Sequence, residues 1–125
     1  MAITGMNHFT ILTDDVPGTV DFYRDLLDLA DGDRPDLGFP GAWLYVGAHA
    51  VLHIVGGRSR DALKPGVIDH IAFSATDLRA TLDRIEARGI DPVVRQQQGT
   101  GFWQVFFHDP NGARVELDFA ANEKA

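Results

Sequence analysis

The fold is decided by the stretch Val67-Ile68-Asp69-His70-Ile71-Ala72-Phe73-Ser74-Ala75-Thr76-Asp77. Successive side chains of a strand point to opposite faces, so Ile71 and Phe73 are predicted to share an apolar face that packs into the core. His70 is predicted to lie on the other face, with the small residues Ala72 and Ser74. The stretch therefore predicts a strand that leads into a helix and carries one imidazole on its polar face.

A second copy of this pattern lies near the N-terminus. His70 follows His8 by 62 positions, and the same offset separates Asp15 from Asp77. Each aspartate comes directly before a helical run of apolar residues, where its side chain can cap the first turn. The sequence therefore predicts an internal duplication of a unit of one strand, one helix and about three strands.

The predicted elements follow the same order in both halves of the chain. The strands are predicted over residues 6–12, 42–46 and 50–55 in the first half, and over 68–75, 92–96, 102–107 and 113–119 in the second. Residues 30–41 are predicted to be a loop, because they are rich in Gly and Pro. These elements define a first module over residues 5–56 and a second over residues 67–119, within a single domain of residues 1–125.

Each module carries polar residues on strands that are otherwise apolar. They are His8 and His53 in the first module, and His70 and Glu116 in the second. All four are predicted to point away from the apolar, helix-packing face, and they converge if the sheet curls. Imidazole and carboxylate together suit a borderline divalent ion such as Zn²⁺, Ni²⁺, Mn²⁺ or Fe²⁺. The sequence therefore predicts a metal site.

Residues near these four have less decisive patterns. Trp43 and Trp103 are predicted to begin corresponding strands and, like Phe102, either line a substrate pocket or fill the sheet. Asn7 and Asp69 are predicted to support the neighbouring histidines rather than to bind the ion. Two further histidines and the tail are predicted to be solvated: His49, His108 and residues 121–125.

Composition limits the possible functions. The chain has 125 residues, 45% of them hydrophobic, which is enough for one domain with a sizeable core. Its net charge of −7 argues against nucleic acid or an anionic membrane surface as a partner. The absence of Cys excludes disulfides, thiolate metal sites and a cysteine nucleophile. No apolar run is long enough to span a bilayer, so a cytoplasmic location is the expectation.

Four segments of the chain resemble the vicinal oxygen chelate superfamily, which includes glyoxalase I, fosfomycin-resistance proteins, extradiol dioxygenases and bleomycin-resistance proteins. The segments are residues 5–10 with 22–27, residues 69–73, and residues 107–117. The resemblance implies an α+β fold in which two βαβββ modules form an open, mostly antiparallel barrel around a metal. It also implies a homodimer.

The resemblance further implies roles for individual residues. His8, His70 and Glu116 match the metal ligands of the superfamily, and His53 matches a fourth ligand that is usually Glu or Gln in glyoxalase I-like members. Glu116 and His53 are also the candidate catalytic residues. The candidate substrate-binding residues are Thr10, Trp43, Phe102 and Trp103. The implied cofactor is one divalent ion: Fe²⁺, Ni²⁺, Zn²⁺ or Mn²⁺.

Several reactions fit this resemblance. The leading expectation is a metal-dependent lyase or isomerase of glyoxalase I type, acting on a small substrate with two adjacent oxygens. Against it, no Arg follows His8 closely, as it tends to in members that use glutathione. The alternatives are an Fe²⁺ extradiol-type dioxygenase with a facial triad of two His and one Glu, a fosfomycin-type thiol transferase, and a non-catalytic, bleomycin-resistance-like drug-binding protein.

Overall fold

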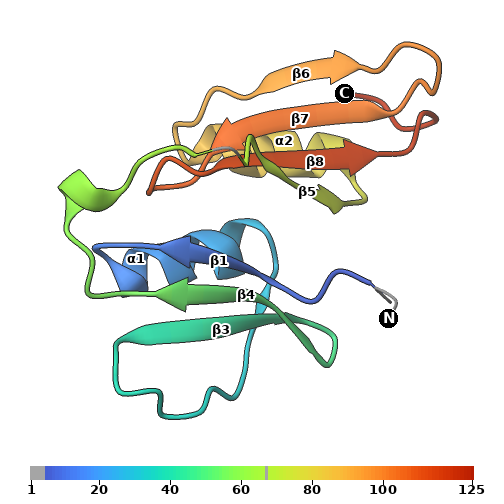
Figure 1. The fold of residues 1–125 in the computed structure, drawn as a ribbon. Coiled ribbons are helices and arrows are strands. Elements are labelled where there is room, and N and C mark those ends of the chain that lie inside the picture. Colours follow the sequence, from blue (N-terminus) through green and yellow to red (C-terminus); the bar gives the residue numbers. More distant parts are fainter. Residues whose placement is uncertain (1–4, 67) are drawn as a thin grey trace. The chain divides into compact units, whose positions relative to one another are not determined.

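The structure is a computed structural model that describes residues 5–66 and 68–125. Val67, where the second module is predicted to begin, lies outside the described residues. The chain divides into two compact units, Met1–Lys64 and Pro65–Ala125. We call them the first unit and the second unit (Figure 1). No helix among the described residues is both long and apolar enough to cross a membrane.

The first unit is a four-stranded sheet with one helical segment. Its elements are β1 (Phe9–Leu12), α1 (Val16–Asp21), the π-helical turn η1 (Phe22–Leu26), β2 (Ala30–Asp31), β3 (Gly41–Val46), β4 (His49–Val55) and the short 3₁₀ helix η2 (Arg60–Ala62). The strand order is β1-β4-β3-β2. Residues 30–41 are predicted to be a loop, but β2 pairs with Tyr45 and Leu44 of β3. That loop prediction is therefore wrong at its first two residues, because pairing with a distant strand overrides their weak local preference.

The second unit repeats this arrangement. Its elements are β5 (Ile71–Ser74), α2 (Leu78–Ala87), β6 (Val93–Gln96), β7 (Trp103–His108) and β8 (Arg114–Phe119). The strand order β5-β8-β7-β6 matches that of the first unit. In each sheet the first strand is parallel to the last, and the remaining neighbours are antiparallel. The predicted α+β class, with βαβββ order and mostly antiparallel sheets, is confirmed.

Alternation along the strands separates a buried face from a polar one. In β8, Val115, Leu117 and Phe119 are at most 4% exposed, and the stripe of α2 formed by Leu78 and Leu82 is equally buried. The spacing of two in the strand and four in the helix brings these side chains to one side of each element. The core therefore takes the odd-numbered positions of β8, and Glu116 lies on the other face.

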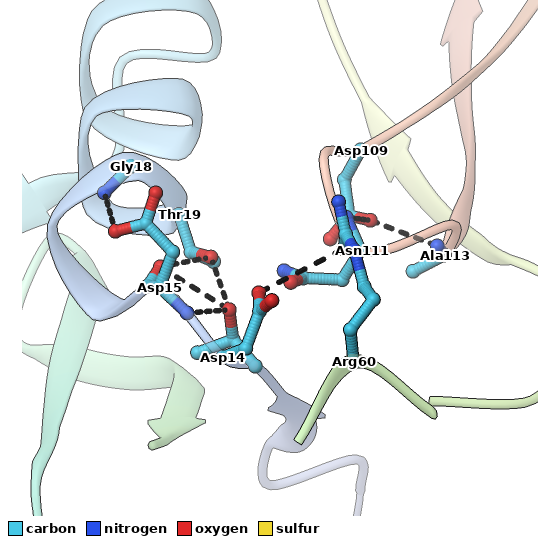
Figure 2. A network of polar contacts seen from close by, with 9 residues as sticks. Asp14, Asp15, Gly18, Thr19, Arg60, Asp109, Asn111 and Ala113 are labelled. Atoms are coloured by element: carbon cyan, nitrogen blue, oxygen red, sulfur yellow. Dashed lines mark hydrogen bonds and ion pairs between the residues drawn. The ribbon is translucent and has the colours of Figure 1, made fainter. Parts of the chain in front are cut away.

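The first helix begins with the aspartate cap predicted from the sequence. Gly18 N donates to Asp15 Oδ1 at 3.0 Å, which satisfies one of the free amides of the first turn (Figure 2). The Thr19 hydroxyl donates to Asp15 O at 2.8 Å and lies 3.0 Å from the Thr13 hydroxyl. This buried hydroxyl pair joins the end of β1 to the start of α1.

The second helix begins differently, so the predicted cap at Asp77 is wrong. Asp77 has a φ of 66° in the left-handed region, and its side chain makes no capping hydrogen bond. An N-cap side chain folds back over the first turn only from an extended backbone, which Asp77 lacks. Glu123 caps the helix instead, because its Oε1 accepts from Leu78 N at 2.7 Å. The tail predicted to be free is therefore anchored, and Trp103 Nε1 also donates to Glu123 O at 2.8 Å.

The predicted turn between β7 and β8 is organised by one carboxylate. Asp109 Oδ1 accepts from Asn111 N and Ala113 N, both at 2.8 Å (Figure 2). Such a side chain takes the place of backbone acceptors in a tight turn. It sets the register in which β8 returns along β7, and hence the position of Glu116.

Candidate metal and substrate site

The second unit brings His70 and Glu116 together. His70 directly precedes β5, and Glu116 of β8 pairs with Ala72 of that strand. His70 Nε2 lies 3.6 Å from Glu116 Oε1. This separation is long for a hydrogen bond, and it is close to the ~3–3.5 Å that separates two donors on one ion with bonds of about 2.1 Å. The pair therefore fits two ligands of one divalent cation.

Asp69 orients the His70 ring. His70 Nδ1 donates to Asp69 Oδ2 at 2.7 Å, and Arg114 Nη1 donates to the same oxygen at 2.9 Å. These two hydrogen bonds, first that from His70, lower the pKa of the Asp69 carboxyl. A carboxylate that holds Nδ1–H leaves Nε2 as the nitrogen with a free lone pair, which is the usual outer contact of a metal-binding histidine.

The first unit repeats this contact at His8. His8 directly precedes β1, and its Nδ1 donates to Asn7 Oδ1 at 2.7 Å. His49 Nε2 donates to the backbone oxygen of Asn7 and so ties this segment to β4. His49 is predicted to be solvated in a turn, but it begins β4 and makes this contact. Asn7 and Asp69 thus support the histidines that follow them, as expected.

His53 forms the centre of an aromatic stack. Its ring lies 3.7 Å from the His8 ring and 4.1 Å from the Trp43 ring, with interplanar angles of 12° and 10°. Burial, followed by the neighbouring His8, lowers the pKa of His53. Two aromatic neighbours therefore hold this imidazole in one orientation, in an environment that favours its neutral form.

Glu116 is buried among polar neighbours. It is 6% exposed, and Gln104 Nε2 donates to its Oε1 at 3.4 Å. Burial, followed by the adjacent Asp118, raises the pKa of Glu116. A buried carboxylate beside a second acidic group is a site that a cation stabilises.

Strand register shows which residues of the two sheets are equivalent. Trp43 pairs with His53 in the first sheet, and Phe106 pairs with Glu116 in the second. The prediction that Trp43 and Trp103 lie on corresponding strands is confirmed, since β3 and β7 occupy the same place in the two sheets, but only Trp103 begins its strand. The register makes Phe106 the counterpart of Trp43. Trp103 shares its face with buried Val105, on the side opposite Glu116.

Sequence reasoning missed the residues that surround the second pair. Phe106 meets the His70 ring edge-on, with centroids 5.9 Å apart. Gln104 contacts Glu116, and Arg95 Nε donates to Gln104 Oε1 at 3.2 Å. One signal was present: the offset of 63 that relates His53 to Glu116 also relates Trp43 to Phe106.

The remaining predicted residues lie near these pairs or at strand ends. Thr10 is exposed and pairs with His53 in the sheet. Phe102 directly precedes β7 and is 48% exposed. Within residues 5–66 and 68–125, no group of three or more His, Cys, Asp or Glu side chains is assembled that could hold a metal. The predicted ligands instead form two pairs, one in each unit.

Comparison with known proteins identifies the family. Residues 5–117 match the sequence model of the Glyoxalase/Bleomycin resistance protein/Dioxygenase superfamily. The chain belongs to this superfamily. Among curated proteins it is 31% identical over 124 residues to glyoxylase I 4 of Arabidopsis thaliana, covering 92% of this chain and 70% of that relative.

Solved structures share the fold at lower identity. FosX, the fosfomycin resistance protein of Listeria monocytogenes, is 20% identical, with a TM-score of 0.77 and 95% of each chain covered. A FosX variant complexed with Mn(II) and 1S,2S-dihydroxypropylphosphonic acid has a TM-score of 0.78 at 19% identity, covering 95% of this chain and 94% of that chain. Lactoylglutathione lyase from Agrobacterium tumefaciens has a TM-score of 0.71 at 19% identity, with 97% of each chain covered.

Proposed function

We propose that this protein is a metal-dependent lyase or isomerase of glyoxalase I type that acts on a small substrate with two adjacent oxygens. The similarity to glyoxylase I 4 supports the reaction class. The observation that carries the proposal is the pair formed by His70 and Glu116. An oriented imidazole nitrogen lies 3.6 Å from a buried carboxylate oxygen, and Asp69 occupies the other ring nitrogen.

We assign His8, His70 and Glu116 as ligands of one divalent ion, which is Fe²⁺, Ni²⁺, Zn²⁺ or Mn²⁺. Both histidines donate Nδ1–H to the preceding side chain, so each has Nε2 for coordination. When bound, the ion supplies a Lewis acid that polarises the adjacent oxygens of the substrate. The chain's own residues hold the substrate and move its protons.

The stacking of the His8 and His53 rings supports a role for His53 beside the metal ligands rather than as one of them. An imidazole binds a metal through a lone pair in the plane of its ring. Two rings that lie nearly parallel at 3.7 Å cannot both direct such lone pairs at one ion. We therefore place His53 beside His8, where its ring can hydrogen-bond a substrate oxygen and serve as a catalytic group.

Glu116 is the second catalytic candidate. Its carboxylate combines burial with a hydrogen bond from Gln104, which holds Oε1 in place. In an isomerase or lyase of this type, a positioned carboxylate takes a proton from one substrate carbon and returns it to the neighbouring carbon. Glu116 is the side chain that we assign to this step.

The substrate contacts follow from the polar faces of the two sheets. Thr10 and Trp43 share a face with His53, and Phe102 is exposed directly before β7. We retain these three residues as substrate contacts. Phe106 takes the place of Trp103, because it lies on the face of Glu116 and contacts the ring of His70.

The metal content of the protein purified without oxygen tests the proposal. We expect about one divalent ion per chain in the wild type and none in His70→Ala, because the loss of one of three ligands greatly lowers affinity. His108→Ala is the matched control, since His108 is an exposed histidine of the same unit at the end of β7. It should retain the ion.

The result can contradict the proposal in two ways. A wild-type protein that binds no divalent ion, or His70→Ala with unchanged content, would falsify the metal site and leave a binding protein of the same fold. Iron as the bound metal, with oxygen consumption on turnover, would instead favour the dioxygenase alternative.

A further inference from the structure

Arg95 lies on the same sheet face as the His70 and Glu116 pair. It pairs with Gln104 across β6 and β7, and Phe106, two positions after Gln104, pairs with Glu116 across β7 and β8. Paired residues and alternate positions share a face. The guanidinium of Arg95 is therefore presented on the face that carries the proposed ligands.

Two contacts fix the Arg95 side chain. Its guanidinium carbon lies 4.9 Å from the centroid of the Phe106 ring, within the range of a cation–π contact. Its Nε donates to Gln104 Oε1 at 3.2 Å, and Gln104 Nε2 donates in turn to Glu116 Oε1 at 3.4 Å. A continuous set of side chains thus connects the guanidinium to the proposed metal ligand.

A second arginine on this face, Arg114, differs from Arg95 in its contacts with carboxylates. Arg114 also contacts the Phe106 ring, at 4.4 Å, but its Nη1 donates to Asp69 at 2.9 Å. Among the described residues, no carboxylate lies within ion-pair distance of Arg95, and the nearby Arg95 charge opposes the rise that burial causes in the pKa of Glu116. Yet the chain has 18 acidic residues against 11 Lys and Arg.

We propose that Arg95 binds an anionic group of the substrate. This inference rests on the proposed function and narrows its substrate class to small organic acids. His70 and Glu116 would hold the ion that polarises the two adjacent oxygens of the substrate, and Arg95 would bind its carboxylate, phosphate or similar oxyanion. The guanidinium is permanently charged, and its planar fork of donors matches such a group. Gln104 is a positioning residue that holds Nε, so that the terminal nitrogens face the ligand.

Three small vicinal diols test this assignment on the full-length, Zn²⁺-loaded protein. Glycerol is the neutral probe, glycerate adds a carboxylate, and glycerol phosphate adds a phosphate. We expect each anionic probe to bind at least about tenfold more tightly than glycerol, as charge-assisted hydrogen bonds produce. Whichever anion binds more tightly identifies the oxyanion. Titration calorimetry in competition mode measures the affinities.

The variant Arg95→Gln should lose the preference for the anionic probes and keep its affinity for glycerol. Arg79→Gln is the matched control: it removes the same charge from the second unit, at a surface ion pair with Asp83 on α2. It should behave as the wild type. Equal anion affinity in Arg95→Gln and wild type, or an equal loss for glycerol, would overturn the assignment.

A metal-free titration separates failure of this inference from failure of the proposed function. The Nε–Hε NMR signal of Arg95, identified by its absence from Arg95→Gln, should shift with glycerate or glycerol phosphate and not with glycerol. A shift in a protein that binds no Zn²⁺ would support anion binding by Arg95 and contradict the proposed metal-dependent function. Zn²⁺ binding without a shift from either anion would contradict only the assignment of Arg95 as the anion-binding residue.

Discussion

Asp69 holds the ring of His70 in place through a single hydrogen bond, and one substitution tests this contact. Asp69→Ala removes the acceptor of His70 Nδ1–H and lets the ring rotate. Loss of such an outer contact typically weakens metal binding by about 10–100-fold. We expect that loss for Asp69→Ala, measured by competition with a chromophoric chelator.

A second variant at the same position is the control for this change. Asp69→Asn reproduces the contact between Asn7 and His8, in which an amide oxygen accepts the same hydrogen bond at 2.7 Å. It should recover most of the affinity that Asp69→Ala loses. Unchanged metal affinity in Asp69→Ala would show that His70 needs no outer acceptor.

The start of α2 shows how an element depends on a distant part of the chain. Glu123 accepts from Leu78 N, while the left-handed Asp77 provides no cap. We expect Glu123→Ala to lower the free energy of unfolding by about 1 kcal/mol, as the loss of a helix cap does. The Trp103 contact should persist, because it uses the backbone oxygen of Glu123. Urea unfolding measures the difference.

The adjacent exposed residue gives the comparison for this change. Lys124→Ala alters the same tail without touching the cap, and it should unfold as the wild type does. Equal stability of Glu123→Ala and Lys124→Ala would mean that solvent satisfies the Leu78 amide as well as the carboxylate does.

At the scale of the whole molecule, the proposed ligands come from both units: His8 from the first, and His70 with Glu116 from the second. If one ion requires both units, removing either histidine removes the same binding event. We therefore expect His8→Ala and His70→Ala each to abolish tight Zn²⁺ binding, and the double variant to lose no more than either single one. Independent sites would give additive losses and two ions in the wild type. Calorimetric titration of the metal-free protein distinguishes these results.

The repeated unit and the faces of its strands follow from the sequence alone. Alternation at Ile71 and Phe73, and the helical spacing that follows each aspartate, depend only on neighbours within a few positions. The order βαβββ and the placement of Glu116 opposite its buried neighbours were therefore predictable. The contacts from Asn7 and Asp69 to the next histidine were predictable for the same reason.

Contacts between side chains that are distant in the sequence follow from the three-dimensional fold. The cap at Leu78 comes from Glu123, at the other end of the second unit. The stack of His53 on Trp43, and the contact of Arg95 with Phe106, depend on the register between strands. Register is set by pairing and packing between separate segments, and a shift of one residue reverses every face. Local periodicity carries no information about that choice, which explains why Phe106 was not among the residues predicted from the sequence.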